Sequence, residues 1–247
     1  IFFYISIMSI KRYVENMKNI EEMLLKFLDC GDYLEENFGN LVDLLIEQNI
    51  LKDKHDLQMF LYIIVQIINN HHHYYGFYSK IEQIIKFIKD EIIEFYSNEE
   101  IFNIFKKSKR ILLFLFDEKI ISVIKSIYNE IMNYQHILCR YPEYFVPELR
   151  TYIEKEIKSS KDPKYKKILY SNLYDIPLLK ENYSKFIEKR KNGENDDYLS
   201  KIIQNDSIEE FIVYIKKENY PINSTIKKSI YETNNFLLNQ CNTNLIE

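Results

Sequence analysis

Residues 197–226 have the sequence DYLSKIIQNDSIEEFIVYIKKENYPINSTI, and this stretch decides the predicted fold. Apolar residues recur at spacings of three and four on both sides of Asn205 and Asp206, a pair typical of a tight turn. The stretch therefore predicts two short helices with one apolar face each. Because such a pair cannot bury both faces alone, it needs stacked neighbours, as in helical repeat proteins. We expect an all-α helical array or solenoid of short antiparallel helix pairs.

The rest of the sequence has the same helical period. Pro142 and Pro147 punctuate a predicted loop over residues 140–147, and the charged segment 189–197 predicts an exposed linker. A weak internal repeat relates residues 101–128 to residues 199–231, although chance similarity remains an alternative in a chain so rich in Ile, Lys and Tyr. Asp53 or Asp56 caps a predicted helix that runs to residue 69. The other predicted helices span residues 9–28, 34–48, 77–96, 100–106, 110–116, 122–133, 148–158, 168–174 and 178–190.

Composition restricts the possible classes of protein. Of the 247 residues, 46% are hydrophobic and 28% are charged, which excludes wholesale disorder, and only 4 are glycine, which disfavours turn-rich β folds. Alanine is absent, so helices must pack through bulky side chains. The net charge of −4 does not favour nucleic acid or an anionic membrane. The apolar runs at residues 1–7 and 57–68 are too short to span a bilayer.

The three cysteines indicate the compartment. Cys30, Cys139 and Cys241 are far apart and form no CxxC pair. This spacing predicts reduced thiols in a cytoplasmic protein, with the nucleus as the alternative.

The opening stretch resembles a degenerate ankyrin repeat. Leu199 occupies the place of the leucine in the ankyrin TPLH motif, Asn205 and Asp206 that of the Asn-Gly turn, and Asn223 that of the asparagine closing the following loop. The departures from the motif are large, because Asp197 and Tyr198 replace its Thr-Pro, Ser200 replaces its histidine, and Ile202 and Ile203 occupy its small-residue positions. The resemblance implies an ankyrin-type helix pair.

The whole chain resembles an uncharacterised family of protist ankyrin-repeat proteins with a helical N-terminal region. The resemblance implies an extension at residues 1–7 before a natural start at Met8, an N-terminal helical region at 8–147, a connector at 148–195, and a degenerate repeat with the truncated start of another at 196–247. The segments that carry it are MSIKRYVENM (8–17), ENFGNLVDLL (36–45), NNHH (69–72), IFNIFKKSKRILLFL (101–115), YPEYF (141–145), EKRKNGEND (188–196) and NSTIKKSIYETNNFLL (223–238).

Few residues suggest chemistry. The run His71, His72 and His73 could ligate a metal, but consecutive side chains diverge on a regular backbone, which favours a solvated turn. His136 and Cys139 lie three residues apart but lack a visible third catalytic group. The basic runs at 106–110 and 189–191 have acidic neighbours, so we expect no nucleic acid. No glycine-rich phosphate loop is present.

We therefore expect a non-catalytic scaffold for protein–protein interaction, without catalytic residues, metal or cofactor. The alternatives are a metal-binding or enzymatic module around residues 71–73, or a truncated fragment without independent function. Ankyrin-type modules bind through the inner helix face and the loop tips. The resemblance accordingly implies partner contacts by Ser200, Lys201, Gln204, Tyr220 and Asn223.

Overall fold

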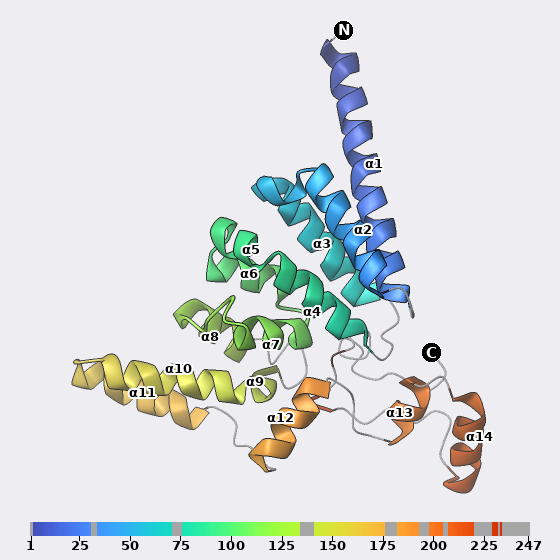
Figure 1. Cartoon of the computed structure of the whole chain (residues 1–247). Helices are drawn as coiled ribbons and strands as arrows, with labels where there is room; N and C mark the ends of the chain where they lie inside the picture. Colours follow the sequence, from blue (N-terminus) through green and yellow to red (C-terminus); the bar gives the residue numbers. More distant parts are fainter. Residues whose placement is uncertain are drawn as a thin grey trace. The chain divides into compact units, whose positions relative to one another are not determined.

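The protein is all-α, as the sequence predicts, and the described part of the chain contains no strand (Figure 1). The chain divides into two compact units, Ile1–Ser97 and Asn98–Glu247. The boundaries predicted at residues 147 and 195 both fall inside the second unit. The structure, a computed structural model, describes residues 2–30, 34–70, 76–133, 141–175, 182–192, 198–204, 207–219, 229–231 and 233.

The first unit is built around the C-terminal half of its first helix. Ile20, Leu24 and Phe27 of this helix are fully buried, since apolar residues at spacings of three and four share one face. The third helix is buried on several sides, as its near-continuous apolar sequence predicts. The elements of the unit are α1 (Phe2–Asp29), α2 (Leu34–Glu47), a 3-10 turn (Ile50–Lys52), α3 (Lys54–Asn70), α4 (Phe77–Phe87) and α5 (Lys89–Phe95).

Several predicted boundaries are wrong. The helix expected over residues 77–96 is broken at Ile88, whose φ of −97° and ψ of 17° are not helical. The first helix extends upstream of Ser9 to Phe2. The predicted loop at 140–147 instead contains a short helix, and Pro147 lies in the first turn of the next one, where a missing N–H leaves no hydrogen bond unmade.

Lys80 of α4 caps the C-terminus of α1. Its Nζ donates to the carbonyl oxygens of Leu28 at 2.5 Å and Cys30 at 2.6 Å. The last carbonyls of a helix have no partner within the helix, and a cation is favoured at that end. Lys80 therefore joins two helices about fifty residues apart by satisfying groups that burial would otherwise penalise.

Lys80→Met should destabilise the first unit by about 2 kcal/mol, because two hydrogen bonds from a charged donor are lost while the apolar stem is kept. Urea unfolding would measure the change. Lys26→Met, at an exposed position on α1, is the matched control and should stay within about 0.5 kcal/mol of the native protein. Equal effects of the two substitutions would contradict a capping role.

The second unit contains shorter helices that pack mainly as sequential neighbours. Helices α10 and α11 form one antiparallel pair and α13 and α14 another, while α6 packs against α7 and α8. The elements are α6 (Asn98–Phe105), α7 (Lys109–Asp117), α8 (Lys125–Asn133), α9 (Tyr141–Tyr144), α10 (Val146–Ser159), α11 (Pro163–Asp175), α12 (Tyr183–Asn192), α13 (Tyr198–Gln204) and α14 (Ile208–Lys217).

A buried arginine fixes α12 in this unit. Arg190 is 3% exposed, and its two terminal nitrogens bind the carboxylate of Glu148 in α10 at 2.6 and 2.9 Å. Its Nη1 also donates to the carbonyl of Tyr144 at 2.9 Å, and the Tyr144 hydroxyl donates to the carbonyl of Arg190 at 3.0 Å. The guanidinium lies over the rings of Tyr144 and Phe186. This bidentate pairing of a guanidinium with a carboxylate is among the strongest geometries of an ion pair.

Arg190→Met should destabilise the second unit by about 3 kcal/mol, because it leaves the Glu148 carboxylate and the Tyr144 carbonyl without their donor. Amide hydrogen exchange of α12 should rise correspondingly. Lys185→Met, at an exposed site on the same helix, should have little effect.

Combining Arg190→Met with Glu148→Met should restore part of the lost stability, since no charge is then left unpaired. Strictly additive losses in this cycle would contradict the pairing.

Candidate functional site

The helix pair α13–α14 corresponds to the stretch that predicts the fold. Leu199 and Ile202 of α13 are buried, whereas the ring of Tyr198 packs on that of Tyr214 with centroids 5.1 Å apart. The Tyr198 hydroxyl donates to the Glu210 carboxylate at 2.7 Å, and this hydrogen bond raises the pKa of Tyr198. The predicted pair of short helices is therefore present, held by one apolar face and an aromatic contact at its edge.

The sequence explains where α14 begins and ends. The carbonyl of Ser207 accepts the first helical hydrogen bond from Phe211 at 2.9 Å. Acidic residues occupy the first turn and basic residues the last, so both complement the helix dipole. Asn219 follows the helix with a φ of 46°, the left-handed conformation that stops a helix and that asparagine tolerates.

Helix α14 presents apolar side chains to solvent. It has no buried residue, although Ile208, Ile212 and Ile215 share one face at spacings of four and three. Ile208 and Ile212 are 65% and 45% exposed, and the adjacent Val213 is 63% exposed. An isolated exposed leucine or isoleucine is ordinary, but here two isoleucines four residues apart are exposed together, and Val213 extends the exposed apolar surface around the helix. We call Ile208, Ile212 and Val213 the α14 face.

The structure places only some of the predicted partner-binding residues. Ser200 is 7% exposed, so its side chain offers almost no surface to a partner, whereas Lys201 is exposed. Gln204 ends α13. Tyr220 and Asn223 lie outside the described residues.

The prediction for this site missed the α14 face. The signal that could have found it was the apolar stripe over residues 208–215. The same stripe also fits helix–helix packing, because sequence periodicity shows that a face is apolar without showing what covers it.

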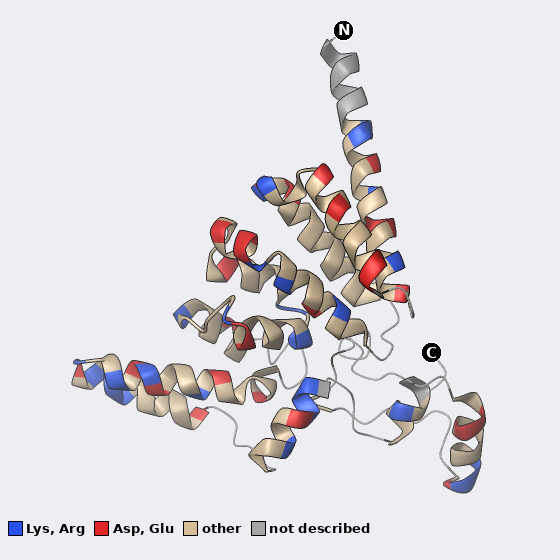
Figure 2. Ribbon diagram, viewed as in Figure 1, with Lys and Arg blue, Asp and Glu red and all other residues tan. Residues whose placement is uncertain are grey.

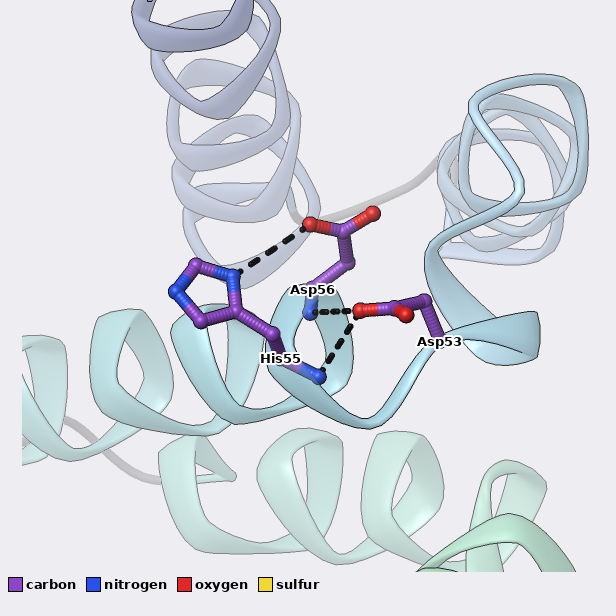
Figure 3. Close-up of side chains that lie close together, drawn as sticks. All are labelled: Asp53, His55 and Asp56. Atoms are coloured by element: carbon purple, nitrogen blue, oxygen red, sulfur yellow. Dashed lines mark hydrogen bonds and ion pairs between the residues drawn. The ribbon is translucent and has the colours of Figure 1, made fainter.

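A second candidate site is a cluster of Asp53, His55 and Asp56 at the start of α3, whose possible ligand atoms all lie within 4.8 Å of one another (Figure 3). One oxygen of Asp53 accepts the backbone N–H groups of His55 and Asp56 at 2.9 and 3.1 Å, so Asp53, and not Asp56, is the N-cap of α3. His55 Nδ1 faces the Asp56 carboxylate at 3.7 Å. A helix cap beside an exposed histidine explains this geometry without a metal.

Tyr13 of α1 joins this cluster to the first helix. Its ring centroid lies 6.2 Å from that of His55. Burial raises the pKa of Tyr13 to about 12, and the negative charges of Asp56 and Asp53 add to the shift. The folded state therefore favours the neutral phenol, since ionisation would bring a third negative charge next to two carboxylates.

Stability should fall between pH 10 and pH 12 as the Tyr13 phenol ionises. Because the folded-state pKa lies above the unfolded value of 10.0, the contribution of Tyr13 is complete below pH 10 and is lost as the pH rises through 12. Tyr13→Phe should reduce this alkaline loss by about 1–2 kcal/mol in urea unfolding at pH 9 and pH 11.5. Tyr183→Phe, at an exposed ring, is the control. Identical alkaline losses in native protein and Tyr13→Phe would contradict the assignment.

The remaining candidates for chemistry cannot be placed. The histidines 71–73, His136 and Cys139 lie outside the described residues, while Cys30 is half-buried with its Sγ 2.9 Å from the carbonyl of Phe27.

None of the helices in the described ranges is long and apolar enough to cross a membrane.

Comparison with known proteins gives no assignment: no family model, no curated protein and no solved structure matches the chain.

Proposed function

We propose that this protein is a non-catalytic helical scaffold, in the manner of ankyrin-type repeat proteins, that binds a helix of a protein partner through the α14 face. The observation that carries the proposal is the exposure of Ile208, Ile212 and Val213 on a helix without a buried residue. Other helices of the second unit pack side by side, as α11 does on α10. Helices pack well against the sides of other helices, so a helix of the partner fits the α14 face.

The chemistry of the α14 face favours binding over catalysis. Its three exposed side chains are aliphatic, and the adjacent charges belong to the helix ends. Aliphatic side chains supply free energy when they leave water, about 1.5–3 kcal/mol for each one fully buried. They cannot donate protons, ligate metals or attack a carbonyl.

Replacing Ile208, Ile212 and Val213 by serine should lower the affinity for the protein partner by at least tenfold, because the apolar area buried in the complex is lost. Folding should be preserved, since these side chains are exposed. Quantitative comparison of proteins captured by the native chain and by the variant would identify the partner, and cross-linking with the purified partner would map its contact. Ile46→Ser with Ile93→Ser is the matched control, since both residues are exposed aliphatics of the first unit.

Two results would overturn the proposal. One is capture of the same proteins by the native chain and the α14 variant. The other is concentration-dependent self-association in sedimentation velocity that the α14 substitutions abolish, since the occupant of the face would then be a second copy of the chain.

A further inference from the structure

The tip of the α10–α11 hairpin concentrates positive charge in an acidic protein. Residues 158–167 contain five lysines and one aspartate, which gives this segment a net charge of +4. Because the whole chain carries −4, the remaining residues carry −8. Lysine and arginine gather where α10 ends and α11 begins (Figure 2). Here the name hairpin tip means residues 158–167.

The lysines of the hairpin tip are not neutralised within the described part of the chain. Lys158, Lys161, Lys164 and Lys167 are exposed, and none of them forms an ion pair with a described residue. The aspartate of the segment, Asp162, caps α11 by accepting the N–H of Lys164 at 2.9 Å. The carboxylate of Asp162 is therefore already bound to the backbone at the start of the helix.

Helix polarity affects the lysines of the hairpin tip differently. Lys158 lies in the last turn of α10, where a cation is stabilised by the helix dipole. Lys164 and Lys166, in contrast, lie in the first turn of α11, which has no acidic residue and where a cation costs up to about 1 kcal/mol. The lysines around the start of α11 thus produce a field that attracts anions.

Exposed aromatic side chains continue the same face of α11. Lys167, Tyr170 and Tyr174 follow one another at spacings of three and four, which places them along one side of the helix. Tyr170 is 50% exposed and Tyr174 is 87% exposed, although tyrosine rings are usually more buried. Ile168 is also exposed, at 57%. The positive charges are therefore followed along the helix by apolar surface.

We infer that the hairpin tip and the adjoining face of α11 bind an acidic protein segment that carries apolar side chains between its carboxylates. Carboxylates would meet the lysines, and the apolar side chains would cover Tyr170 and Tyr174. A short segment fits better than a nucleic acid, because a duplex carries one negative charge about every 1.7 Å and would extend over a chain whose remaining charge is −8. This surface does not include α14, so the inference does not rest on the proposed function.

The test uses the full chain and a fluorescent twelve-residue peptide of alternating glutamate and leucine pairs, with a peptide that has glutamine for glutamate as its counterpart. Fluorescence anisotropy should show binding of the glutamate peptide, weakened severalfold between 50 and 200 mM salt because exposed charges are screened. The triple variant Lys161→Gln, Lys164→Gln and Lys167→Gln should bind at least tenfold more weakly.

Matched variants separate the local surface from net charge. Lys11→Gln, Lys26→Gln and Lys52→Gln together change the charge equally at exposed sites of the first unit and should leave binding unchanged. Tyr174→Ser should weaken binding about threefold, whereas Tyr183→Ser, at another exposed tyrosine, should not. The α14 serine variant should bind the peptide as the native chain does, which distinguishes failure of this inference from failure of the proposed function.

The inference would be overturned by absence of binding to the glutamate peptide, by equal binding of the glutamine peptide, or by equal losses in the two lysine variants. Preferential binding of a twenty-nucleotide oligothymidylate, or of vesicles containing phosphatidylserine, would overturn it in favour of a nucleic acid or a membrane surface. Circular dichroism and thermal unfolding should first show that each variant is folded, as expected for substitutions of exposed lysines.

Discussion

The ends of the helices set the main constraint on this structure, because every helix leaves carbonyl groups that need a partner. Glycine is the usual residue after a helix, but the chain has only four. Long side chains from elsewhere take over this role at several ends. Lys80 binds carbonyls at the end of α1, the Tyr141 hydroxyl binds that of Lys106 after α6, and Arg190 and Tyr144 bind each other's carbonyls. Packing and capping are therefore achieved by the same residues.

Other helix ends adopt the left-handed conformation without glycine. Lys119 has a φ of 57°, and the N–H groups of Lys119 and Ile120 return to the carbonyls of Phe116 and Leu115, which closes α7 in the usual two-bond pattern. Asn49 stops α2 in the same conformation at a φ of 55°. A lysine at such a position costs about 1–2 kcal/mol relative to glycine, so the packing of α7 must compensate.

The sequence predicts the structural features that depend on local patterns. It does not predict the features that depend on contacts between residues far apart in the chain. Helical periodicity correctly gave the all-α class, and it left Asp53 and Asp56 as the two candidate caps of α3, of which the structure shows Asp53. The prolines at 142 and 147 suggested a loop, but buried Tyr141 and Tyr144 hold a helical turn there through bonds to residues at least 35 positions away. The ion pair of Arg190 and Glu148 spans 42 residues and leaves no periodic signal, so sequence reasoning placed Arg190 in an exposed linker.

Surface size limits what the α14 face can do by itself. A helix of ten residues is about 15 Å long, and one side of it supplies far less than the 1,000 Å² or so that stable interfaces bury. The contact proposed at α14 would therefore be weak and rapidly exchanging by itself, as in a transient complex. Higher affinity would require further contact surface. The hairpin tip offers a charged surface, and charges of this kind speed association more than they slow dissociation. A partner with an acidic segment beside an apolar helix would combine both contributions.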